Sequence, residues 1–142
     1  MRILGLDLGS KTIGVAISDE LNLIAQGLFT LKRKGLQQDI RELQKLIEEQ
    51  GVKKIVIGLP KNMNNTLGPS ANMVLSFVEE LKKCVDLPVI TWDERLSTVA
   101  AEKVLLEADM SRKKRKRLID KVAAQLILQG YLDSRQRLHN SQ

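Results

Sequence analysis

The chain has 142 residues, of which 43% are hydrophobic, 28% are charged and only 3% are aromatic. This composition is typical of one globular domain with a core of its own. It excludes wholesale disorder and disfavours a single-strand binder that stacks bases on aromatic side chains. One cysteine and one histidine exclude an internal disulfide and do not suit a zinc site, so we expect a reducing cytoplasm. No apolar run approaches 18 residues, so we expect no membrane partner.

The first part of the chain predicts three strands followed by a helix. Short apolar runs cover residues 2–8 and 13–18, and the brief gap between them suggests a hairpin. A third strand is expected over residues 26–32. Apolar side chains then recur at helical spacing over residues 36–50, and Gly51 is a typical helix stop.

The second part of the chain predicts two more strands that alternate with helices. Strand 54–59 leads into the turn-rich segment 61–69, and a helix is expected from Ser70. Strand 88–93 follows, with a third helix from about 97 to 108. This order predicts an α/β fold in which helices flank a mixed five-stranded sheet, because the later β-α-β crossovers produce parallel strands.

A last helix is expected directly after the basic residues 112–117. One apolar stripe would face the core: Ile119, Val122, Ala123, Leu126, Ile127 and Gly130. Leu128 and Leu132 point away from this stripe. They would either form a dimer contact or be covered by other core elements, so the chain is expected to be a monomer or a weak homodimer.

Carboxylates lie where strands end or where this last helix begins. Asp7 interrupts an apolar strand near its carboxyl end, which is costly unless a hydrogen-bond network or a metal ion compensates. Asp93 and Glu94 end another strand, and Asp120 is expected at the start of the last helix. Each of these acids could also be structural, as a cap or a complement to a helix dipole. If they converge, all-oxygen ligation would suit Mg²⁺ or Mn²⁺.

Strand alternation leaves open whether Asp93 or Glu94 faces Asp7. Neighbouring residues on a strand point to opposite faces, so both acids cannot meet Asp7 on one face while the strand continues. Glu94 lies one residue further out and has a longer side chain. Its reach therefore favours Glu94 as the ligand at the end of the sheet.

The whole basic excess of the chain lies in one short run. The chain has 23 Lys and Arg against 17 Asp and Glu, which gives a net charge of +6. Six of the 23 cations are consecutive: Arg112, Lys113, Lys114, Arg115, Lys116 and Arg117. The run is either a solvated segment or the binding surface for a polyanion, of which nucleic acid is the first candidate.

Four ordered motifs resemble the YqgF/RuvX family. They are GLDLGSKTIGVAISD (5–19), IVIGLP (55–60), DERLST (93–98) and DKVAAQLILQGYLD (120–133). The resemblance implies one ribonuclease H-like domain over residues 1–142 and a metal-dependent nuclease that matures the 5′ end of pre-16S rRNA. The family's other common label is Holliday-junction resolvase.

The resemblance also implies roles for individual residues. The family's acidic positions, catalytic and metal-binding, match Asp7, Glu94 and Asp120. Weighed from the sequence itself, Lys11 could contact a phosphate of the substrate or be a solvated turn residue, and Arg95 could bind a phosphate or anchor Glu94. The run 112–117 would hold the backbone of the substrate. RuvC-type resolvases carry a further acid one helical turn on in the last helix, where this chain has Ala123 and Ala124.

Three other functions compete with an RNA nuclease. A DNA junction resolvase would use the same acids, and its symmetric cuts would favour a two-fold dimer. A non-catalytic nucleic-acid-binding module would need the basic run and none of the acids. An actin-like ATPase, suggested by DLG alone, needs two such domains and therefore more than 142 residues.

Overall fold

The computed structural model describes residues 1–60, 67–94 and 112–140, and in the last helix it describes the side chains of residues 121–136. Five strands and three helices lie in these ranges. In chain order they are β1 (Arg2–Leu8), β2 (Thr12–Ser18), β3 (Ala25–Lys32), α1 (Leu36–Gln50), β4 (Val52–Leu59), α2 (Pro69–Cys84), β5 (Val89–Asp93) and α4 (Arg112–Asn140).

The five predicted strands and the first two predicted helices are confirmed, with ends that shift by no more than two residues. Gly51 ends α1 as expected. It adopts the left-handed conformation, with φ of 64°, and donates its backbone N–H to the carbonyl of Ile47. The helix predicted over residues 97–108 lies outside the described residues.

The strands form one sheet in the order β3-β2-β1-β4-β5. β1, β2 and β3 pair antiparallel, as a meander. β4 and β5 then add parallel to β1, with α1 and α2 as the crossovers. The predicted mixed sheet is confirmed, and the carboxyl ends of β1, β4 and β5 lie at the same edge.

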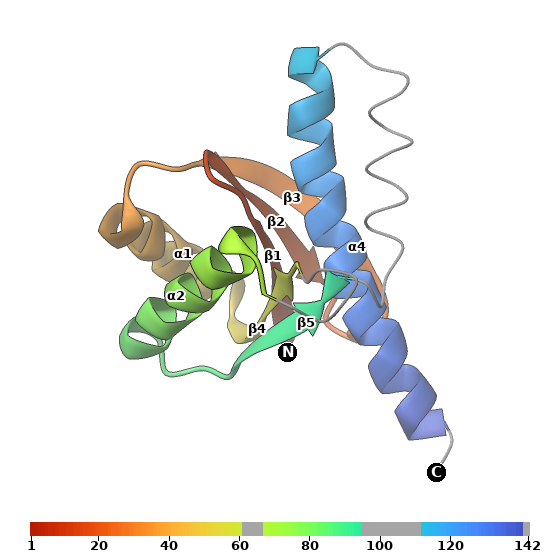
Figure 1. The fold of residues 1–142 in the computed structure, drawn as a ribbon. Coiled ribbons are helices and arrows are strands. Elements are labelled where there is room, and N and C mark those ends of the chain that lie inside the picture. The colour runs from red at the N-terminus through yellow and green to blue at the C-terminus, as the bar shows by residue number, and fades with distance from the viewer. Residues whose placement is uncertain (61–66, 95–111, 141–142) are drawn as a thin grey trace.

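Helices cover the two faces of this sheet unequally (Figure 1). α1 and α2 pack on one face, where alternate strand residues such as Leu4, Leu6 and Ile57 build the larger core cluster. α4 crosses the other face, where Ile3 and Val56 build a smaller one. We call these the α1/α2 face and the α4 face. Strand alternation assigns each residue of β1, β4 and β5 to one of them.

α4 lies unusually close to β1 because Gly5 has no side chain. A Cβ on Gly5 would lie 2.7 Å from the Cβ of Leu128 and 3.2 Å from the carbonyl oxygen of Ala124. Leu128 in this contact and Leu132, one turn further along α4, are both fully buried. The suggestion that they form a dimer contact is therefore wrong. The helix crosses several strands and buries more than one stripe.

The start predicted for the last helix is also wrong. α4 begins at Arg112, so the basic run forms its first turns and Asp120 is its ninth residue. Lysine and arginine are good helix formers, and neither glycine nor proline interrupts residues 112–129. Although α4 has 29 residues, no helix within the described ranges is long and apolar enough to cross a membrane.

Candidate active site

Asp7 lies near the carboxyl end of β1 and points to the α4 face. It shares this face with Ile3 and Gly5, whereas Leu4, Leu6 and Leu8 belong to the core on the α1/α2 face. Only 7% of Asp7 is exposed, so the carboxylate is held at the margin of the core. A buried carboxylate in this position needs compensating interactions.

The structure resolves which acid of β5 shares the face of Asp7. Val89 packs in the core on the α1/α2 face, so Asp93, four residues on, belongs to that face. Ile90 and Trp92 pack on the α4 face instead. Glu94 follows in the same alternation, just after β5 ends, and its Oε1 lies 2.8 Å from the place where a Cβ on Gly58 would be.

Gly58 thus makes room for the Glu94 carboxylate beside Asp7. Leu6 of β1 pairs with Ile57 of β4, so Asp7 and Gly58 are the next residues along two neighbouring strands. Such strands are about 4.8 Å apart. A side chain at position 58 would meet both Glu94 and the buried Ile127. Because Gly58 has no side chain, the Asp7 and Glu94 carboxylates lie on one face, at the ends of the two strands on either side of β4.

The backbone of Asp120 lies alongside the same end of β1. Asp120 precedes the buried Ala123 and Ala124 by one helical turn, so it belongs to the face of α4 that packs on the sheet. Ala124 lies over Gly5, and α4 runs opposite to β1 because Leu132 and Ile3 border one hollow. From this contact, Asp120 is four residues back along α4 and Asp7 is two residues forward along β1. Both steps run in the same direction, and each covers about 6 Å.

Asp120 is therefore on the same part of the α4 face as Asp7, although its side chain is outside the described set. As the ninth residue of α4, it is also too far from the helix N-terminus to serve the dipole. The effect of the dipole falls off within the first turn. The dipole explanation of Asp120 is therefore wrong, and a role in the site stays a prediction.

Sequence reasoning missed a buried ion pair beneath the turn between β1 and β2. Arg33, just after β3, donates from Nε to Oδ2 of Asp39 over 3.2 Å. Asp39 is only 1% exposed, and its other oxygen accepts the backbone N–H of Lys34 over 2.9 Å. The guanidinium also lies 5.8 Å from the ring centre of Phe77 on α2.

This pair holds the turn that follows Asp7. Arg33 donates from Nη1 to the carbonyl of Gly9 over 3.1 Å, and its backbone N–H donates to the carbonyl of Lys11 over 2.9 Å. Gly9 in turn donates to Thr12 over 2.8 Å. Lys11 is exposed at the tip, where a phosphate could reach it. Arg33 and Asp39 are only six residues apart, across the turn into α1, and this proximity was the signal that could have found the pair.

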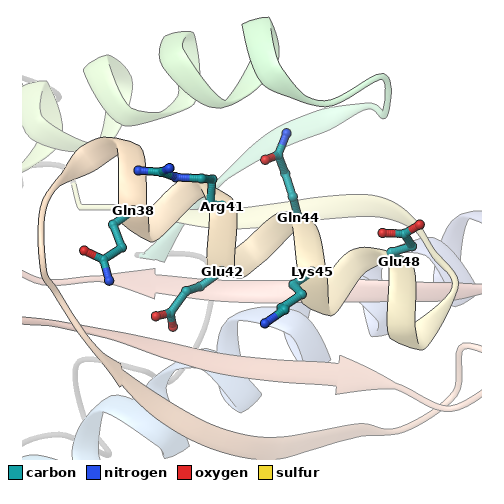
Figure 2. A pocket seen from close by; sticks show the side chains of 6 residues that line it. All are labelled: Gln38, Arg41, Glu42, Gln44, Lys45 and Glu48. Atoms are coloured by element: carbon teal, nitrogen blue, oxygen red, sulfur yellow. The ribbon is translucent and has the colours of Figure 1, made fainter.

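The other residues predicted to bind phosphate cannot be placed in the site from the described side chains. Arg95 lies outside them, and the structure describes only the backbone of residues 112–117. A hollow along α1, which Figure 2 shows, lies on the opposite face of the sheet from Asp7. Its lining mixes Arg41 and Lys45 with Glu42 and Glu48, so no charge of one sign dominates it.

The chemistry of the donors fits a hard divalent cation. Asp7 and Glu94 offer carboxylate oxygens on one face, and Asp120 would add a third, which is the ligand type that Mg²⁺ and Mn²⁺ prefer. Among the side chains that the structure describes, no three acids, histidines or cysteines form a metal-binding group. The predicted metal ligands include Asp120, whose side chain is not among those described, so this finding does not test the predicted metal site.

Comparisons with known proteins agree on one family. A family model described as "RuvX: Holliday junction resolvase" matches residues 1–134. A Desulforamulus reducens protein named "Putative pre-16S rRNA nuclease" is 58% identical over 134 residues, which cover 94% of this chain and 98% of that protein. A protein of the same name from Clostridioides difficile is 61% identical over 132 residues, 93% of this chain and 94% of that protein.

Solved structures agree with the fold class. RuvC of T. thermophilus in complex with a Holliday junction substrate has a TM-score of 0.59 at 14% identity, with 96% of each chain covered. The Fowlpox virus resolvase in complex with Holliday junction DNA has a TM-score of 0.57 at 13% identity, covering 94% of this chain and 98% of that one. The predicted ribonuclease H-like α/β fold is confirmed. With the match over residues 1–134 and relatives at 58% and 61% identity, the chain belongs to the RuvX family.

Proposed function

We propose that this protein is a metal-dependent nuclease that cleaves phosphodiester bonds of structured nucleic acid, with the 5′ end of pre-16S rRNA as its first substrate. The observation that carries the proposal is the placement of Asp7 and Glu94 on one face of the sheet, at the ends of the two strands that flank β4, with Gly58 of β4 leaving space between them for the Glu94 carboxylate. The relatives at 58% and 61% identity, whose printed name is a pre-16S rRNA nuclease, support the choice of substrate.

Asp7, Glu94 and Asp120 would hold Mg²⁺ or Mn²⁺ at the carboxyl ends of β1 and β5 and on α4. Such an ion, when bound, activates water and stabilises the leaving oxygen of a phosphodiester. The chain itself supplies rigid placement. Asp7 is set in a buried strand, and the turn after it is fixed by Arg33. Lys11 and Arg95 would contact phosphates close to the acids.

The basic run would bind the backbone of the substrate further along. Because α4 begins at Arg112, the six cations are on a helix that continues directly to Asp120 and the sheet. A helix sets the spacing of the backbone of these residues from Asp120, unlike a solvated tail. Neutralising several of these cations would reduce affinity equally for all sequences, since phosphate contacts carry no sequence information.

DNA junction resolution is the second candidate, because the family model and the RuvC neighbour name a Holliday junction. The α4 residues argue for RNA processing instead. Ala123 and Ala124 occupy the turn where RuvC-type resolvases are expected to carry a further acid, and both are fully buried. Leu128 and Leu132 are also buried in the protein's own core, so we propose a monomer. The lone cysteine, Cys84, is an exposed thiol, which suits the cytoplasm.

Cleavage assays on a pre-16S rRNA 5′ segment and on a four-way DNA junction test the function. We expect Mg²⁺- or Mn²⁺-dependent cleavage of the RNA that a chelator abolishes. Asp7→Asn and Glu94→Gln should be inactive but folded, because removing one charge relieves repulsion between the acids. Asp93→Asn is the matched control and should keep its activity, at a cost of about 1 kcal/mol in stability. Full activity of Asp7→Asn would refute the catalytic assignment.

A further inference from the structure

A second cationic cluster lies on the α4 face, at the opposite end of the sheet-packed part of α4 from Asp120. Lys54 of β4 donates from Nζ to the phenol oxygen of Tyr131 over 3.1 Å. Arg135, one turn further along α4, donates from Nη1 to the same oxygen over 3.0 Å. Both cations also lie over the Tyr131 ring, 5.6 and 5.8 Å from its centre. Trp92 packs edge-on against that ring at 5.9 Å.

The charges in this cluster are unbalanced. Two cations that donate to one oxygen are no more than about 6 Å apart, a distance at which like charges repel. Among the described side chains, no carboxylate forms an ion pair with Lys54 or Arg135. Burial acts to raise the pKa of Tyr131. The hydrogen bonds from Lys54 and Arg135 and their charges outweigh it, so the pKa is lowered from its ordinary value of 10.0.

The cluster can be reached from solvent and has donors to offer. Arg135 is exposed, and Tyr131 and Arg135 line a surface hollow. Lysine carries three N–H donors and arginine five, so both cations keep donors beyond the one that each gives to Tyr131. A phosphate oxygen could accept these donors, and its negative charge would balance the two cations.

The cluster lies where a nucleic-acid strand running along α4 from Asp120 would pass. Tyr131 follows Asp120 by eleven residues on one helix, which is about 16 Å along its axis. Successive phosphates of one strand are about 3.4 Å apart along the axis of B-form DNA and somewhat closer in an A-form RNA helix, so this distance corresponds to about five nucleotides or slightly more. The basic run 112–117 lies on the other side of Asp120 along the same helix.

We propose that Lys54, Tyr131 and Arg135 bind a backbone phosphate of the nucleic-acid substrate about five nucleotides from the cleaved bond. The proposal rests on the proposed function, because the ligand is the polynucleotide that the acids would cleave. The substrate would then contact α4 on both sides of Asp120, at the basic run and at Tyr131. The number of nucleotides between the cleaved bond and the Tyr131 end of the substrate would therefore determine how tightly the substrate binds.

Salt-dependent binding tests this site in an Asp7→Asn background, which prevents cleavage. The double change Lys54→Gln and Arg135→Gln should reduce the slope of log affinity against log salt by about 1.5 units, as expected for two lost charges. The matched control changes Arg41 and Lys45 to glutamine; both are exposed on α1, on the opposite face of the sheet (Figure 2). The control should leave the slope unchanged. An equal slope for the double variant and its parent would overturn the proposal.

Substrate length gives a second test. A substrate with fewer than about five nucleotides on the Tyr131 side should bind the parent and the double variant equally, since it cannot reach the cluster. A double variant that still binds this short substrate more weakly than the parent does would also contradict the site.

The lone tyrosine and lone tryptophan report on the site directly. A bound phosphate would compete for Lys54 and Arg135, so the pKa of Tyr131, followed by phenolate absorbance, should rise when RNA binds. An unchanged titration with bound RNA would refute the site, as would a rise caused by poly-glutamate but not by RNA. If the wild-type protein neither binds nor cleaves nucleic acid, the proposed function itself fails. If it does both and the double variant behaves like its parent, only the Tyr131 site fails.

Discussion

Gly5→Ala tests the close approach of α4 to β1, on which the placement of Asp120 beside Asp7 depends. The added Cβ would lie 2.7 Å from the Cβ of Leu128 and 3.2 Å from the carbonyl oxygen of Ala124. Neither atom can rotate away, because one is the first atom of a fully buried side chain and the other is helix backbone. The helix must therefore move away from the strand.

The expected cost is in the upper part of the range for overpacking a core, about 2–3 kcal/mol in the free energy of unfolding. For a chain of this size the melting temperature should fall by about 7–10 °C. Because α4 would move from the β1 end that carries Asp7, we also expect the variant to need a higher metal concentration for half-maximal cleavage. Urea unfolding and a metal titration of the cleavage rate measure the two effects.

Gly27→Ala is the matched control. Its Cβ would come nearly as close, 2.9 Å from Cγ of Lys121, but that side chain is exposed and flexible and can move into solvent. Its stability should stay within about 0.5 kcal/mol of the parent. Equal stabilities of the two variants, or a Gly5→Ala protein as stable as the parent, would refute the packing argument.

Three further predictions concern the Arg33–Asp39 ion pair, the core residue Leu128 and the hydrogen bond from Lys54 to Tyr131. Asp39→Ala leaves Arg33 without its buried partner and should lower the free energy of unfolding by about 3 kcal/mol, measured by urea unfolding. Leu128→Ala should cost about 3 kcal/mol in the same measurement, and a cost below about 0.5 kcal/mol would return this residue to the surface. Lys54→Gln should move the pKa of Tyr131 back up toward 10.0. Because the folded-state pKa is lowered, the phenolate stabilises the fold above 10.0, and this contribution is lost as the pH falls through the folded-state value. A Lys54→Gln protein that titrates like its parent would exclude the hydrogen bond.

The sequence by itself determined the local elements and the unusual acid. Alternating and helical apolar patterns located five strands and two helices to within two residues. Asp7 was visible as a carboxylate in an apolar strand, because such a placement is costly in any fold. These features depend on residues close together in the chain, so no knowledge of distant contacts was needed.

Only the tertiary structure decided which faces meet. Alternation places Asp93 and Glu94 on opposite faces, but which of them looks toward Asp7 depends on which helix covers each face. Leu128 changed from a candidate dimer contact to a core residue because α4 crosses several strands. The space that Gly58 leaves for Glu94 depends on strands that come together only when the chain folds. The local pattern of apolar residues determines whether a segment is a helix or a strand, whereas the packing of the whole chain determines which other element each of its faces contacts.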